Sequence, residues 1–226
     1  MFFLVDNERK ILFGWSAKCG CSHIKSIFWY FQNGLIKNTI HTYKDMMQLP
    51  DDIENFTSII IVRNPFQRLV SGFLNKYSIA GEYRCKWKTR TISFDDFVED
   101  LIREKWDTVD RHHFDKQTSE NFDRTKLLQS KIIKCYDLPH IDYKYIENLF
   151  GKRIPDAVLN KKFGHERDIS KPNWPKEQVH NLEMEEYFHY NVEYKYFFNP
   201  EMKEKLKEFY KDDFDFFREF GLRYDI

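Results

Sequence analysis

Apolar runs separated by turn-forming residues predict the first elements of the fold. Residues 10–15 form a short apolar segment that ends in a turn, which predicts a strand. Residues 16–20 form a loop. From about Cys21 the apolar positions recur at helical spacing as far as Gly34, a residue type that commonly ends helices. A strand, a tight loop and a helix are therefore expected in that order.

The same succession of elements is predicted again further along the chain. Residues 58–62 are a run of mostly β-branched residues, typical of a strand covered on both faces of a parallel sheet. Asn64 and Pro65 suit the N-cap and the first turn of the helix that follows. Residues 131–136 predict another strand.

Capping residues predict three later helices: residues 94–105 after Ser93, residues 143–150 after Asp142, and one long C-terminal helix of residues 200–220 after Asn199. Because strands alternate with helices, the pattern predicts an α/β fold with a central, mostly parallel sheet and helices on both faces. A length of 226 residues suits a single domain over residues 1–226.

Composition and charge narrow the classes of function. The 36 Lys and Arg residues balance the 36 Asp and Glu residues, which argues against bulk nucleic-acid binding. No apolar run reaches the ~18–20 residues of a membrane span, and the N-terminal segment lacks the features of a signal peptide. A complete chain would therefore be expected in the cytoplasm. The four cysteines show neither a disulfide pattern nor a zinc-site spacing, so reduced thiols and no metal are expected.

The first predicted strand leads into a loop suited to an anion. Unpaired backbone N–H groups and the helix dipole favour negative charge at a helix start, and Lys18 adds a full positive charge. Gly20 allows the backbone to approach a ligand closely, and Ser22 supplies a hydroxyl group. Lys18 precedes Gly20, so the loop is not a Walker A motif. The alternative is a solvated lysine in an ordinary turn.

A second candidate anion site follows the second strand. Arg63 leaves the carboxyl end of that strand, where open α/β sheets bind ligands, and its guanidinium group suits phosphate. Ser71 lies about two helical turns further on. The alternative is a surface arginine and a serine that bonds its own helix backbone.

Together these segments resemble sulfotransferases that use 3′-phosphoadenosine 5′-phosphosulfate (PAPS), most closely the Golgi-type carbohydrate sulfotransferases. Residues 17–25 resemble the loop P-K-x-G-C-T-S-x-K, with Ala17 in place of Pro and Ser22 in place of Thr. Residues 62–71 resemble V-R-[DN]-P-[FY]-x-R-[LF]-x-S, and residues 209–217 resemble the Y-x-x-D-[FY]-x-x-[FL] ending. The resemblance implies a P-loop-like, three-layer fold. It also implies the Golgi lumen if the sequence is a trimmed catalytic domain.

The resemblance also implies a role for each candidate residue. Lys18 would stabilise the leaving group. The 5′-phosphate group would be bound by the loop residues Lys18, Cys19, Gly20, Cys21, Ser22 and His23, and the 3′-phosphate group by Arg63 and Ser71. Residues 113–117 resemble the H-[WFY]-x-P-Q element, with Lys116 in the place of Pro. His113 would then be the general base, because a histidine pKa lies near neutral pH. His112 and Asp115 are the alternatives.

The sequence leaves the acceptor open. The resemblance favours a carbohydrate hydroxyl over a protein tyrosine, a lipid head group or a small alcohol. Exposed tryptophans could stack on a sugar ring or a tyrosine, and the candidates expected to be exposed are Trp15, Trp87, Trp106 and Trp174. Most aromatic residues are expected in the core. The basic segment of residues 161–167, with Lys161, Lys162, His165 and Arg167, could close over the nucleotide or contact an anionic acceptor, and the alternative is a solvated loop. A nucleotide-dependent kinase and a non-catalytic nucleotide-binding module are the rival functions, and the oligomeric state is open.

Overall fold

The protein folds into two compact units, each with its own hydrophobic core. The structure, a computed structural model, describes residues 1–37, 48–77, 92–119, 122–161 and 170–224. The first unit contains residues 1–63, 117–164 and 216–222. The second contains residues 64–116, 165–215 and 223–226. Each unit is therefore assembled from segments that are distant in the sequence.

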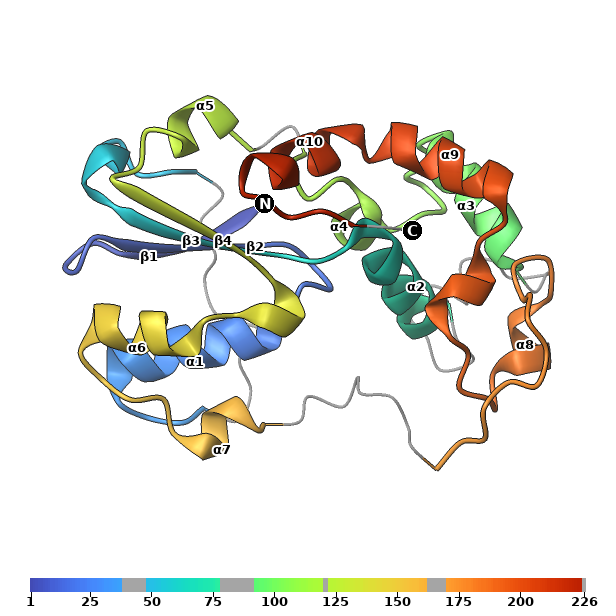
Figure 1. The fold of residues 1–226 in the computed structure, drawn as a ribbon, viewed down its shortest axis with the longest axis horizontal. Coiled ribbons are helices and arrows are strands. Elements are labelled where there is room, and N and C mark those ends of the chain that lie inside the picture. Colours follow the sequence, from blue (N-terminus) through green and yellow to red (C-terminus); the bar gives the residue numbers. More distant parts are fainter. Residues whose placement is uncertain (38–47, 78–91, 120–121, 162–169, 225–226) are drawn as a thin grey trace. The chain divides into compact units, whose positions relative to one another are not determined.

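The first unit is built on a sheet with the strand order β1-β2-β3-β4 (Figure 1). Its strands are β1 (Phe2–Asp6), β2 (Ile11–Trp15), β3 (Thr57–Val62) and β4 (Ile132–Asp137). The pairs β2–β3 and β3–β4 are parallel, whereas β1 is antiparallel to β2. The mostly parallel sheet of an α/β fold is thus confirmed. The two strands that precede the predicted anion loops, β2 and β3, are neighbours.

The edge strand β1 was not predicted. It forms a hairpin with β2, and Asp6 closes the turn by accepting hydrogen bonds from the Arg9 backbone N–H (2.9 Å) and from Arg9 Nη1 (3.0 Å). The available signal was an apolar run, residues 2–5, followed by the turn-forming residues Asp6 and Asn7.

Helices lie on both sides of this sheet (Figure 1). One side is covered by α1 (Cys21–Asn33), α6 (Tyr143–Phe150) and α7 (Asp156–Leu159), and the short α5 (Arg124–Leu127) lies on the other. Ile59 and Ile61 join the core cluster that includes Phe28 of α1, while Ile60 and Val62 are equally buried. The central strand is therefore covered on both faces, as its continuous apolar run predicted.

In its described part, the second unit consists of helices and connecting segments. Its helices are α2 (Pro65–Lys76), α3 (Phe94–Ile102), α4 (Arg111–Phe114), α8 (Met184–Tyr187), α9 (Pro200–Phe209) and the beginning of α10 (Lys211–Glu219). Aromatic rings dominate its core: Phe73 meets Phe94 edge to face at 5.0 Å, and Phe97 meets Phe114 in the same way at 4.7 Å. Each fully buried aromatic side chain contributes about 2 kcal/mol through burial.

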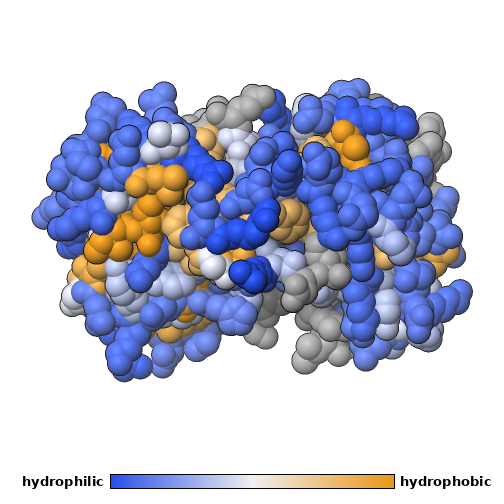
Figure 2. Space-filling view, turned by 45° about the horizontal axis from the view of Figure 1, so that its top comes forward, coloured by the Kyte–Doolittle hydropathy of each residue, from blue (hydrophilic) through white to orange (hydrophobic). Residues whose placement is uncertain are grey.

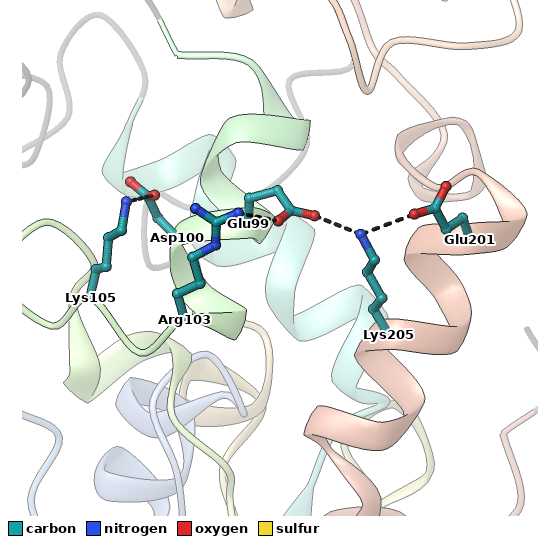
Figure 3. Close-up of polar contacts among 6 residues, drawn as sticks. All are labelled: Glu99, Asp100, Arg103, Lys105, Glu201 and Lys205. Atoms are coloured by element: carbon teal, nitrogen blue, oxygen red, sulfur yellow. Dashed lines mark hydrogen bonds and ion pairs between the residues drawn. The ribbon is translucent and has the colours of Figure 1, made fainter.

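Ion pairs connect two helices of this unit at the surface (Figure 3). Lys205 of α9 lies between Glu99 of α3 (2.8 Å) and Glu201 of its own helix (3.0 Å). Arg103 pairs with Glu99 from the other side at 3.4 Å. Since the side chains of these residues are at least two-fifths exposed, they hold α3 beside α9 only weakly.

Two predicted helices have different bounds in the structure. The helix after Ser93 ends at Ile102 rather than near Lys105, because Glu104 adopts a left-handed backbone (φ 53°) that a helix cannot contain. The single long C-terminal helix is also wrong, since α9 and α10 are separated at Tyr210. Tyr210 is fixed by its buried hydroxyl group, which donates to the Phe114 carbonyl at 2.7 Å. The boundary between the two units does not fall at this break but within α10, since residues 200–215 belong to the second unit and residues 216–222 to the first.

Hydrophilic side chains cover most of the surface seen in Figure 2, with smaller hydrophobic areas between them. Large apolar side chains that are at least a third exposed are Leu35, Ile36, Leu74, Leu128, Ile132 and Tyr194. Among the helices of the described segments, none has both the length and the apolar character needed to cross a membrane.

Candidate functional site

The loop between β2 and α1 has a constrained backbone. The Cys19 N–H donates to the Ser16 carbonyl at 3.1 Å, and both Lys18 (φ 66°) and Gly20 (φ 72°) are left-handed. A lysine in this conformation costs about 1 kcal/mol, so contacts around the loop must hold it there. Such strain is typical of ligand-binding loops.

The N-terminus of α1 is suited to a negatively charged ligand. Gly20 is its N-cap, without a side chain to accept hydrogen bonds from the first turn, and this turn contains no acidic residue. A Cβ atom at Gly20 would lie 2.5 Å from Cδ1 of Leu138 and would displace that side chain, so close packing as well as the left-handed φ favours glycine here. The helix dipole therefore acts at this end without an internal carboxylate to offset it.

Arg63 brings the second predicted anion motif to this loop. It follows directly after β3, and its Nη1 atom donates to the Lys18 carbonyl oxygen at 3.1 Å. The parallel pairing of β2 with β3 explains the proximity, since the carboxyl ends of both strands lie at the same edge of the sheet. The Arg63 guanidinium group thus lies against the backbone of the Lys18 loop, and we call Arg63 and this loop the basic cluster of the first unit.

Gln117 joins the same cluster from a distant part of the chain. Its side chain is fully buried. Its Oε1 atom accepts hydrogen bonds from the Arg63 backbone N–H (3.1 Å) and from the Cys19 thiol (3.0 Å), and its Nε2 atom donates to the Arg63 carbonyl (2.8 Å). One amide group therefore connects the end of β3 with the loop after β2.

The remaining residues of the loop have different surroundings. Ser22 is buried and Cys21 is partly exposed at the first turn of α1. The His23 ring contacts the Tyr143 hydroxyl through Nε2 at 2.9 Å, and burial lowers the pKa of His23, which keeps the ring neutral near pH 7. The His23 side chain is therefore engaged with α6. Burial, with Asp137 and Cys19 nearby, raises the pKa of the Cys135 thiol, which stays protonated.

Ser71 and His113 belong to the second unit and are described within it. Ser71 is partly buried on α2, next to Gly72. A Cβ atom at Gly72 would lie 2.5 Å from the ring of Phe114, so the glycine allows α4 to pack closely against α2. Arg68 of α2 also donates through Nη1 to the Asp115 carbonyl at 2.7 Å. These contacts fix the short helix that carries His113.

A carboxylate orients the His113 ring. Asp110 caps α4 by accepting from the His112 backbone N–H through Oδ1 (3.1 Å), and its Oδ2 pairs with Nδ1 of His113. Burial alone would raise the pKa of Asp110, but its hydrogen bond with His113 and the nearby positive charges together lower it. Because the ionised carboxylate only accepts hydrogen bonds, Nδ1 of His113 carries the proton and Nε2 has the lone pair of a base.

The surroundings of the two alternative bases, His112 and Asp115, make them less suitable than His113 as proton acceptors. Partial burial, and after it the nearby positive charge of His113, lower the pKa of His112 to about 4, although Asp110 acts in the opposite direction. The His112 ring is therefore a weak base at neutral pH. The carboxylate of Asp115 forms an ion pair with Nε of Arg111 at 3.0 Å. Among these three groups, the geometry favours His113.

Sequence reasoning missed the contributions of two residues. It aligned Gln117 with a family element but gave it no role, and it did not consider Asp110. The available signal for Asp110 was its position three residues before His113, where an N-cap carboxylate can reach the histidine ring. Hydrogen bonds between Gln117 and Arg63, which are 54 residues apart, had no comparable local signal.

A pocket of about 800 Å³ lies within the second unit. Two of its walls are connected by hydrogen bonds from the Trp174 N–H to the Asn191 carbonyl (2.9 Å) and from the Asn191 N–H to the Pro172 carbonyl (2.8 Å). Aromatic and amide side chains line it, among them Asn173, Trp174, Asn191, Tyr194 and Tyr196. Rings beside amide groups are suited to a polar ligand that has one flat apolar face.

Of the other tryptophans proposed for stacking, Trp106 is partly exposed, Trp87 lies outside the described residues, and Trp15 is buried beneath Lys25. The expectation that Trp15 is exposed is therefore wrong. It ends β2 inside the core, where its ring stacks on Phe2 at 5.0 Å. Of the basic segment, only Lys161 is described; its Nζ atom donates to the Lys37 carbonyl at 2.5 Å.

The fold and this basic cluster define an α/β protein with groups suited to an anion at the carboxyl ends of two adjacent parallel strands. A profile described as the sulfotransferase family matches residues 2–220, nearly the whole chain. The chain therefore belongs to the sulfotransferase family. No significantly similar sequence was found among curated proteins, and no significantly similar fold among solved structures. Within the described residues, no group of three or more His, Cys, Asp or Glu side chains has a geometry that could hold a metal ion.

Proposed function

We propose that this member of the sulfotransferase family transfers a sulfuryl group from PAPS to the hydroxyl group of a carbohydrate. The observation that carries the proposal is the hydrogen bond between the Arg63 guanidinium and the Lys18 carbonyl. It brings together the residues of two motifs, each suited to one phosphate of a nucleotide phosphorylated at both its 3′ and 5′ positions. An ordinary nucleotide or free phosphate would need only one of these two motifs.

The surroundings of the loop residues are compatible with a 5′-phosphosulfate group. Gly20, Cys21, Ser22 and His23 offer backbone N–H groups at the start of α1, and no carboxylate in that turn competes with an anion. Cys19 is buried and supports the loop from within. Ser71 joins Arg63 in the proposal as a ligand of the 3′-phosphate, on the resemblance of residues 62–71 to the family motif.

The proposed chemistry requires one base and one cation. As the acceptor oxygen bonds to sulfur, the bond between sulfur and the bridging phosphate oxygen breaks, and the adenosine 3′,5′-bisphosphate (PAP) leaves. His113 accepts the hydroxyl proton on Nε2, while Asp110 stabilises the resulting imidazolium through Nδ1. Lys18 neutralises the charge that develops on the bridging oxygen.

The pocket of the second unit supports a carbohydrate as the acceptor. Trp174 and Tyr196 present partly exposed rings, and Asn173 and Asn191 present amide groups. Sugars have both a flat apolar face and hydroxyl groups, which such rings and amides respectively contact. Tyrosine, lipid and small-alcohol acceptors are the competing outcomes of the test.

The proposal is tested by incubation of the protein with labelled PAPS and a panel of glycans, tyrosine peptides, lipids and alcohols. Label is expected in a glycan. Lys18→Ala and His113→Ala are expected to abolish transfer while leaving the fold intact. The matched control is His180→Ala, because His180 also pairs with a carboxylate, that of Asp95, at 2.8 Å, and should retain transfer. Hydrolysis of ATP, or tight nucleotide binding with no transfer to any acceptor, would favour the rival functions.

A further inference from the structure

The amide group of Gln117 occupies the place of a missing backbone partner. At the end of β3, the Arg63 N–H and C=O groups are both hydrogen-bonded to it, at 3.1 and 2.8 Å. This two-point pairing is the one that an adjacent peptide group would make in a sheet. It fixes the backbone from which the Arg63 side chain leaves.

The same amide group also holds the loop that carries Lys18. Its Oε1 atom accepts from the Cys19 thiol at 3.0 Å, and the backbone carbonyl of Gln117 lies 3.5 Å from Oγ of Ser16. Cys19 and Gln117 are both fully buried, so water does not compete for these bonds. Gln117 therefore contacts the loop at its start and in its middle.

We propose that Gln117 is a positioning residue that sets the spacing between the Lys18 loop and Arg63, and thereby makes the protein selective for a nucleotide phosphorylated at both ends. The inference rests on the proposed PAPS site. The two phosphate groups of one nucleotide are a fixed distance apart, so both can be bound only if the two cationic residues are held at a matching separation. Arg63 binds the Lys18 carbonyl directly, and Gln117 contacts both the Arg63 backbone and Cys19.

The test is the affinity for PAP and for adenosine 5′-monophosphate, measured by calorimetry. The variant Gln117→Met keeps the length of the side chain and removes its hydrogen bonds. It is expected to weaken PAP binding about tenfold or more, with a much smaller effect on the 5′-monophosphate, so that the preference for PAP collapses. In an Arg63→Ala background the same substitution should have little further effect on PAP affinity, because Gln117 acts through Arg63.

The matched control is Gln32→Met, which removes a 2.6 Å hydrogen bond to Asp6 in the same unit without contacting the loop. It should leave the preference unchanged. A loss of general stability would lower both affinities together, and thermal melting of each variant identifies that case. If Gln117→Met does not fold, Cys19→Ala removes one of the same bonds and is expected to reduce the preference less.

The outcomes separate the two ideas. The native protein could prefer PAP while the Gln117→Met variant, or the Cys19→Ala variant used in its place, keeps the full preference. That result would overturn the positioning role and leave the proposed function standing. A native protein that binds both nucleotides equally would overturn the proposed PAPS site, and the positioning role with it.

Discussion

Gly20 is the point where the anion loop is most sensitive to a single added methyl group. Gly20→Ala places a Cβ atom at a left-handed position and 2.5 Å from Cδ1 of Leu138. The backbone strain costs about 1–2 kcal/mol. Since Leu138 is only partly buried and can rotate, its displacement adds about 1 kcal/mol, at the low end of the range for overpacking. The expected loss of stability is therefore about 2–3 kcal/mol.

Thermal melting and urea denaturation measure this loss. For a chain of this size, 1 kcal/mol corresponds to about 2–4 °C, so the melting temperature should fall by about 4–12 °C. The matched control is Gly151→Ala, because Gly151 is also left-handed (φ 61°) but has open space around its Cβ position. Its loss should be about 1–2 kcal/mol, the strain alone, and about 1 kcal/mol smaller than the loss for Gly20→Ala.

Leu138→Ala supplies the second arm of the test. In the Gly20→Ala background it should cost less than in the native protein, because the smaller side chain removes the clash. The difference between the two backgrounds should be about 1 kcal/mol. Equal losses for Gly20→Ala and Gly151→Ala, together with additive effects of Leu138→Ala, would refute the close approach of Leu138 to the loop.

Two further predictions concern the second unit. Asp110→Asn should lower kcat for sulfuryl transfer by about tenfold or more with little change in KM, because the ring of His113 loses the charge that stabilises its protonated form. A rise in KM with an unchanged kcat would contradict this role. The pKa of Asp110 is lower in the native protein than in the unfolded chain, where it lies near 4, so ionised Asp110 stabilises the native protein at pH values above about 4. This stabilisation is lost as the pH falls. The Asp110→Asn variant lacks it, and in urea denaturation it should therefore lose less stability than the native protein between pH 6 and pH 3. Lys205→Ala removes two of the exposed ion pairs of Figure 3, those with Glu99 and Glu201, and it should change the melting temperature only slightly, with the small effect vanishing at high salt. A large, salt-independent loss would show that these two pairs are stronger than their exposure implies.

Much of the fold follows from local sequence signals. The strands β2, β3 and β4 correspond to short apolar or β-branched runs, and these were predicted to within one or two residues. Helix starts were equally clear, because Ser93, Asp142 and Asn199 each accept a backbone hydrogen bond at the predicted N-cap. Such features depend only on neighbouring residues, which is why the sequence alone reveals them.

The features that were missed depend on contacts between distant residues. The break between α9 and α10 occurs where Tyr210 is anchored to Phe114, 96 residues earlier in the chain. The amide of Gln117 connects Cys19 and Arg63 through bonds that span 98 and 54 residues. The approach of Arg63 to Lys18 was expected, since neighbouring parallel strands end at one edge, but the groups that hold the two together were not.

The discontinuity of the two units has a consequence for synthesis on the ribosome. The first unit includes residues 216–222 as well as residue 1, so it cannot be completed until almost the entire chain has been translated. Its sheet likewise waits for β4, whose partner β3 emerges some 75 residues earlier. Nascent chains should therefore expose the unpaired side of β3 for several seconds, a period in which a holding chaperone would be of most use.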